Sequence, residues 1–138
     1  MTDPDSATAR HARRVPRFIA VGTAAALVHW GVVSAIVQTL HWHPLIANVL
    51  GWIVALQVSF FGHHRMTFQG HGVPLWQSAT RFSAISAGGF AINELAYAAM
   101  LRWSDQSYQV SLAIVLLGVA VLTYLLSSRW AFLARSQE

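Results

Sequence analysis

The chain has 138 residues, of which 55% are hydrophobic and 10% are charged, and its formal net charge is +4. Soluble domains carry about 25% charged residues, so this composition favours burial in a lipid bilayer over exposure to water. The absence of cysteine excludes disulfides, thiolate catalysis and thiolate metal sites.

The chain order predicts an all-α membrane protein with a short polar start. Residues 1–16 are polar and read as an N-terminal tail, since no short apolar core with a small-residue cleavage site is present. Residues 17–135 are predicted to form one transmembrane domain. Its four apolar stretches approach the roughly 20 residues that cross a bilayer as a helix. The predicted spans are residues 18–40, 45–62, 82–101 and 110–128.

The same pattern occurs twice in the chain, at an offset of 64 residues. Arg17-Phe18 opens the first apolar stretch and Arg81-Phe82 opens the third (81 − 17 = 64). Arg65 and Arg129 close the second and fourth stretches at the same offset (129 − 65 = 64). Internal repeats are common in transporters, so the sequence predicts two weakly similar two-helix halves.

The arginines predict the orientation in the membrane. All nine basic residues are arginine, and only Arg102 falls on the far side of the predicted bilayer. Because arginines accumulate on the cytoplasmic side, both termini are predicted to be cytoplasmic. Each half has two spans, so both halves enter the membrane from the same side, and a homodimer would be parallel. The arginines flank apolar stretches and form no single basic face, which argues against nucleic acid as a partner.

Three polar residues fall near the middle of predicted spans. A carboxylate at the bilayer centre costs about 2.5–3.5 kcal/mol even on a mild scale, so Glu94 is expected to be protonated, paired or facing a wet cavity. His29 and Asn93 occupy equivalent positions of the repeat (93 − 29 = 64). Two interpretations stay open. The three residues line one midplane cavity, or they form hydrogen bonds that hold helices together.

The second span carries two further polar residues, Asn48 and Gln57. Nine residues correspond to about 900° of helical rotation, so the two side chains are predicted to face opposite sides of the helix. One of them is then a helix-packing residue and the other a site residue. The sequence does not say which is which.

Four arginines are predicted to ring the cytoplasmic mouth of the helical bundle: Arg17, Arg65, Arg81 and Arg129. Guanidinium groups bind phosphate bidentately, although arginines also anchor helices and bind anionic lipid. Neighbouring histidines such as His63 and His64 point apart on a helix, so no metal site is predicted. No cofactor motif, paired carboxylates or nucleophile constellation is present, so an enzyme is not expected.

Several short motifs resemble the GtrA-like family of small four-span membrane proteins. The first half has Arg17-Phe18, Gly22, Ala47-Asn48 and a closing segment with Ser59, Phe60, Arg65 and Phe68. The second half echoes it with Tyr124, Ser128, Arg129, Trp130 and Phe132. The resemblance covers residues 17–132. It implies a multi-pass protein of the bacterial inner membrane that flips a polyprenyl-phosphate-linked monosaccharide for cell-envelope polysaccharide synthesis, with a glycosyltransferase as a possible partner.

Combined with the polar residues, the resemblance suggests a mechanism. The phosphate docks on the arginines, chiefly Arg65 and Arg129, and the sugar enters the polar interior, where Trp30 and Trp52 stack on its apolar face. No covalent bond changes. Two alternatives stay open: a small proton-coupled exporter of cations or drugs, and a membrane partner that positions a glycosyltransferase without transporting anything.

Overall fold

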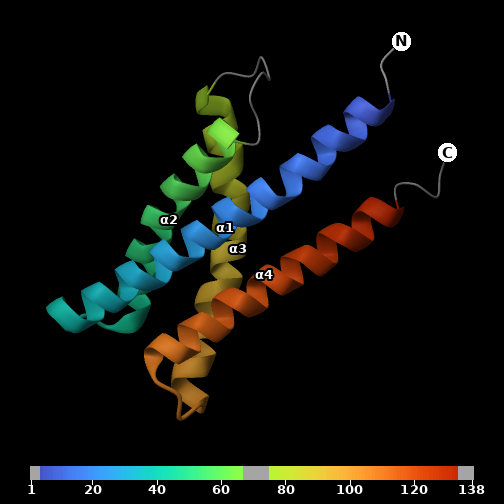
Figure 1. The fold of residues 1–138 in the computed structure, drawn as a ribbon. Coiled ribbons are helices and arrows are strands. Elements are labelled where there is room, and N and C mark those ends of the chain that lie inside the picture. Colours follow the sequence, from blue (N-terminus) through green and yellow to red (C-terminus); the bar gives the residue numbers. More distant parts are fainter. Residues whose placement is uncertain (1–3, 67–74, 134–138) are drawn as a thin grey trace. The chain divides into compact units, whose positions relative to one another are not determined.

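The computed structural model describes residues 4–66 and 75–133, with side chains over residues 16–65, 76–77 and 79–122. It contains four helices: α1 (Pro4–Leu40), α2 (Pro44–Met66), α3 (Leu75–Trp103) and α4 (Tyr108–Leu133), and no strand occurs within these ranges (Figure 1). Three stretches are long and apolar enough to cross a membrane: Pro16–Leu40, Pro44–Arg65 and Ala79–Trp103. The apolar part of α4 whose side chains are described, Tyr108–Leu122, is shorter. The predicted all-α membrane protein with four helices is confirmed.

The chain divides into two compact units, and each is described by itself. The first unit, Met1–Ser86, holds α1, α2 and the start of α3, and the second, Ala87–Glu138, holds the rest of α3 and α4. Helix α1 begins inside the predicted polar tail, whose alanines and arginines are strong helix formers. Helices α2 and α4 begin 64 residues apart, at Pro44 and Tyr108 (108 − 44 = 64). The offset of the sequence repeat therefore also relates the starts of α2 and α4.

Local chemistry explains where the two hairpin connectors lie. His41 follows the end of α1 with φ at 55°, a left-handed conformation that commonly ends a helix. Pro44 then opens α2, where its missing N–H is not needed. In the second connector, Ser107 precedes α4, and its Oγ accepts a hydrogen bond from the Val110 amide at 3.4 Å.

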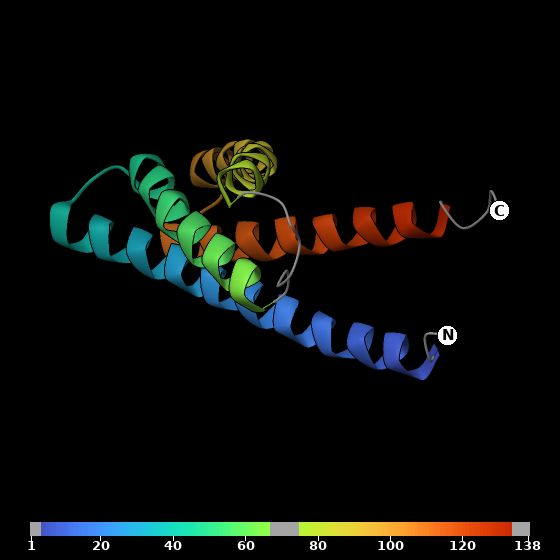
Figure 2. The same ribbon diagram turned by 90° about the horizontal axis from the view of Figure 1, so that it is seen from above.

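Small residues let α1 and α2 approach each other closely (Figure 2). On α1, residues at every fourth position are buried: Val21, Ala25, His29 and Val33. On α2, the buried face includes Ala47, Gly51 and Ala55. A Cβ atom added at Gly51 would lie 2.6 Å from Val33 Cγ2 and 3.1 Å from the His29 carbonyl oxygen. We call this contact between the buried faces of α1 and α2 the seam. It shows the small-residue packing that is typical of membrane helices.

In the second unit, residues 104–107 connect α3 to α4. Among the residues that the structure describes, these two helices do not share the extended close approach of α1 and α2. The repeat explains the difference, because larger side chains occupy the seam positions. Val115 stands where the first unit has Gly51, and Tyr97 stands where it has Val33.

Large apolar side chains are exposed on every helix, including Leu27, Ile53, Leu95 and Leu117. Exposure of so many large apolar groups is unfavourable in water. In a bilayer these faces contact acyl chains, so the exposed surface agrees with the hydropathy of the helices.

Candidate functional site

Aromatic rings from three helices contact one another in the first unit, near the ends of their apolar spans. The rings of Phe18 on α1 and His63 on α2 stack with centroids 4.6 Å apart. Phe82 on α3 lies 6.1 Å from the His63 ring and 5.7 Å from the ring of Phe60. His63 is 5% exposed, so a histidine rather than an apolar residue occupies the centre of this contact. The start of the apolar span Pro16–Leu40 on α1, the end of Pro44–Arg65 on α2 and the start of Ala79–Trp103 on α3 are therefore packed together.

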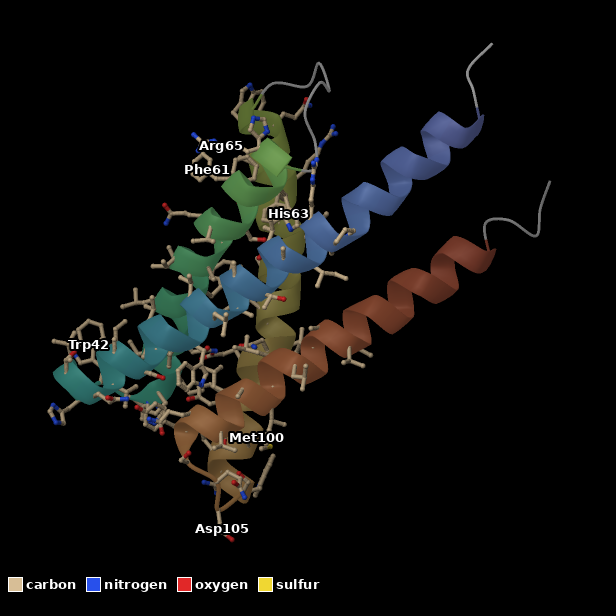
Figure 3. All side chains as sticks on the ribbon, in the orientation of Figure 1. Trp42, Phe61, His63, Arg65, Met100 and Asp105 are labelled. Atoms are coloured by element: carbon tan, nitrogen blue, oxygen red, sulfur yellow. The ribbon has the colours of Figure 1, made fainter. Side chains whose placement is uncertain are left out.

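This packing brings three predicted phosphate-binding arginines to the same end of the first unit. Arg17 precedes Phe18, Arg81 precedes Phe82, and Arg65 follows His63 by two residues. All three arginine side chains are exposed, whereas His63 faces the neighbouring helix (Figure 3). Exposed guanidinium groups at the adjoining ends of these apolar spans can bind phosphate. The fourth predicted arginine, Arg129, belongs to α4, but its side chain lies outside the described residues.

His29 and Asn48 form a buried hydrogen bond between α1 and α2. The His29 Nε2 donates to the Asn48 Oδ1 at 2.7 Å, and the two residues are 5% and 0% exposed. A buried polar group that loses its partner costs about 1–3 kcal/mol. The contact therefore supports the helix-packing interpretation of these two predicted site residues.

The other predicted residues of the first unit have different surroundings. Gln57 is exposed and its Nε2 donates to the Ile53 carbonyl oxygen of its own helix at 3.3 Å, on another face from the buried Asn48. Trp52 on α2 donates through Nε1 to Ser86 Oγ on α3 at 3.0 Å. Trp30 exposes 38% of its surface. Trp52, one of the two tryptophans predicted to stack on a sugar, is thus tied by a hydrogen bond to a neighbouring helix.

In the second unit, polar residues line the buried side of the helix pair. Asn93 is buried on α3 and Glu94 beside it is partly exposed. The Tyr97 hydroxyl donates to the Tyr108 carbonyl oxygen at 3.2 Å, across the connector. Ser111 on α4 is fully buried. Because Asn93 and Glu94 belong to a different unit from His29, their shared cavity stays a prediction.

Sequence reasoning missed three residues that the structure makes prominent. The sequence predicts that His63 and His64 point apart on their helix, and this is correct, because His63 is buried and His64 is exposed. One of two adjacent histidines must then face the protein, and it is His63. Tyr97 and Ser111 are the repeat equivalents of Val33 and Ala47, and all four are buried. Comparing the two halves position by position would have found them.

The family model for the transmembrane domain of GtrA/DPMS proteins matches residues 17–132. The chain belongs to this family. The predicted GtrA-like resemblance is thereby confirmed over the range in which it was recognised. The matched range of the GtrA/DPMS domain includes the four arginines and the buried polar residues of both units.

Individual relatives of this GtrA/DPMS protein are similar over shorter stretches. A protein of Salmonella phage P22 named bactoprenol-linked glucose translocase is 35% identical over 52 residues, which cover 38% of this chain and 43% of that protein. A protein of Shigella phage SfII with the same name is 32% identical over 53 residues, or 38% and 44% of the two chains. The prophage homologue of Escherichia coli K12 is 30% identical over 53 residues, again 38% and 44%. The match thus spans less than half of each relative. No solved structure matches the chain.

Proposed function

We propose that this GtrA/DPMS protein moves a polyprenyl-phosphate-linked monosaccharide from the cytoplasmic to the outer leaflet of the bacterial inner membrane. The observation that carries the proposal is the convergence of the arginine-bearing ends of three apolar spans around His63. Membership of the family and similarity to proteins named for translocating bactoprenol-linked glucose support it. The transported lipid would serve the synthesis or modification of cell-envelope polysaccharide.

The lipid's phosphate is the group that the arginines recognise. A phosphodiester carries a negative charge and acceptor oxygens, and a guanidinium group offers two parallel donors to such oxygens. Arg17, Arg65 and Arg81 supply these donors from three helices, and Arg129 is the fourth candidate. The polyprenyl chain stays in the bilayer, along the exposed apolar faces of the helices.

The sugar presents the larger barrier, because each unmatched hydroxyl is costly in hydrocarbon. Polar side chains at depth lower this barrier by replacing water as hydrogen-bond partners. Asn93 and Glu94 are the deep polar residues that we propose for this role, because His29 and Asn48 bond to each other between α1 and α2. Translocation breaks and forms no covalent bond, so the protein needs no catalytic base and acts as a transporter rather than an enzyme.

The proposed direction of transport requires both termini in the cytoplasm, as the bias of eight arginines to one predicts. All copies then share one orientation, and a homodimer is parallel. A glycosyltransferase that uses the delivered lipid at the outer leaflet is the expected functional partner.

The deciding experiment is a translocation assay with the purified full chain in liposomes. A polyprenyl-phosphate-linked glucose is placed in the inner leaflet, and its arrival outside is measured by oxidation with impermeant periodate. Protein-dependent arrival is expected. A chain that moves no lipid but releases protons on binding a lipophilic cation would be an exporter, and a chain inactive in both assays would be a non-transporting partner. Either result overturns the proposal.

A further inference from the structure

Hydroxyl groups gather where α3 and α4 meet in the second unit. The Tyr97 hydroxyl contacts the Tyr108 carbonyl oxygen at 3.2 Å. Ser111 follows Tyr108 by three residues, which places both on one face of α4. Figure 3 shows the connector end of this unit, with Met100 and Asp105 labelled. The equivalent positions of the first unit carry no hydroxyl: Val33, Pro44 and Ala47.

Two of these hydroxyls are buried without a hydrogen-bond partner in the described part of the chain. They are the Tyr108 hydroxyl and the Ser111 Oγ. A serine in a helix can turn its hydroxyl toward the carbonyl four residues earlier. A tyrosine cannot do so, because its ring holds the hydroxyl away from its own backbone. The Tyr108 hydroxyl therefore needs a partner from outside its helix, and Ser111 lies one turn away with a second unused hydroxyl.

The acids Glu94 and Asp105, which lie nearest in sequence to Tyr97 and Tyr108, favour a neutral polar ligand over an anion at these hydroxyls. Glu94 lies three residues before Tyr97 on α3, so the two share a helix face. Arg102 lies in the last turn of α3, and its side chain is exposed. An ionised Glu94 would repel a phosphate. In either protonation state it can bond a sugar hydroxyl, because such a hydroxyl both donates and accepts.

We propose that Tyr97, Tyr108 and Ser111 form a monosaccharide-binding face in the second unit, and that this face selects the sugar of the transported lipid. The inference rests on the proposed function. The sugar's hydroxyls supply the partners that Tyr108 and Ser111 lack, and the partly exposed ring of Tyr108 offers a flat apolar surface to the ring of the sugar. Tyr97 positions Tyr108 through its hydrogen bond to the backbone.

The test uses the full chain in liposomes with a panel of lipids: one polyprenyl phosphate carrying glucose, galactose or mannose, and the same lipid without sugar. Two variants remove only an oxygen atom, Tyr108→Phe and Ser111→Ala. The control is Ser34→Ala, because Ser34 on α1 also has a buried hydroxyl without a partner but lies in the first unit. Melting temperatures in detergent show whether each variant folds.

Each second-unit variant is expected to slow the preferred sugar lipid about threefold to tenfold, as the loss of one hydrogen bond predicts. Rates for the three sugars then approach one another, while the control keeps the wild-type preference. A uniform fall for all lipids, no change, an equal effect of Ser34→Ala, or a wild type without sugar preference would overturn the inference and leave the proposed function standing. A wild-type chain that moves no lipid at all would overturn both.

Discussion

The two helix pairs share several buried positions of the repeat but use them differently. His29 and Asn93 are both buried, as are Val33 and Tyr97. Three further pairs on α2 and α4 follow the same rule: Ala47 and Ser111, Asn48 and Leu112, Gly51 and Val115. Yet α1 and α2 are closely packed, whereas α3 and α4 share no such extended contact among the described residues. The repeat thus preserves the buried positions nearest the two connectors, while the side chains at those positions decide how closely the helices pack.

The two helix pairs also differ in whether their buried polar groups are hydrogen-bonded to each other. In the first pair, the buried side chains of His29 and Asn48 are hydrogen-bonded to each other, so they form a closed polar pair. In the second pair, Leu112 replaces the asparagine, and the described hydroxyls of Tyr108 and Ser111 are buried without partners. A closed polar pair stabilises a helix interface, whereas unpaired groups have hydrogen-bonding capacity left for a ligand. We infer that the first pair is the rigid half and the second the adaptable one.

The largest effect is expected where a residue of the second pair is placed in the seam of the first. Gly51→Val introduces the residue that stands at position 115, and its Cβ would lie 3.1 Å from the His29 carbonyl oxygen, which is backbone and cannot move alone. Overpacking of this kind costs about 1–3 kcal/mol or more. Thermal unfolding in detergent should show a large loss of stability. Gly22→Val is the matched control, because a Cβ at Gly22 meets no atom within 4 Å. Equal stability of the two variants would contradict the close seam.

Arg65 and Arg129 are equivalent in the repeat, so a comparison of Arg65→Ala with Arg129→Ala tests whether both halves bind the phosphate. A charge-assisted hydrogen bond contributes about 1.5–3 kcal/mol, so Arg65→Ala should slow lipid translocation about tenfold to a hundredfold. Arg102→Ala, an exposed arginine at the last turn of α3, serves as the control and should retain wild-type rates. Normal translocation by Arg65→Ala would remove this arginine from the proposed phosphate site.

Asn48→Leu converts the closed polar pair into the arrangement of the second unit, with Leu at the position of Leu112. His29 would lose its hydrogen-bond partner Asn48 while staying buried, at a cost of about 1–3 kcal/mol. Adding His29→Asn, the residue at position 93, should change stability by less than the sum of the two single effects, because the two residues contact each other. Chemical denaturation of the four proteins measures this coupling. Strict additivity would show that the 2.7 Å contact is not formed.

The smallest effect is expected at the contact between α2 and α3 in the first unit. Trp52→Phe keeps an aromatic ring but removes the donor to Ser86 Oγ, and a neutral hydrogen bond contributes about 0.5–1.5 kcal/mol. The second unit has Leu116 at the equivalent position, which offers no such donor. Ser86→Ala should cause a similar loss, and the double variant should lose little more. A much larger effect of Trp52→Phe alone would assign this side chain a role beyond the bond.

Hydropathy and spacing predicted much of the fold but only part of the site. Residue order alone predicts the apolar stretches, the connectors and the arginines at the ends of these stretches, Arg17, Arg65 and Arg81. The partner of His29 did not, because Asn48 lies 19 residues away and either of two polar residues on α2 could have faced it. The burial of His63 between aromatic rings likewise depends on how α2 is rotated against its neighbours.

By itself, the order of residues determined a membrane protein with four helices, two related halves and arginines at the helix ends, because hydropathy, charge and internal repetition are properties of the chain. Only the tertiary structure decided which polar groups meet and which are left unpaired. Those outcomes depend on the rotation and separation of packed helices, and a side chain as small as Gly51 or as large as Tyr97 changes both.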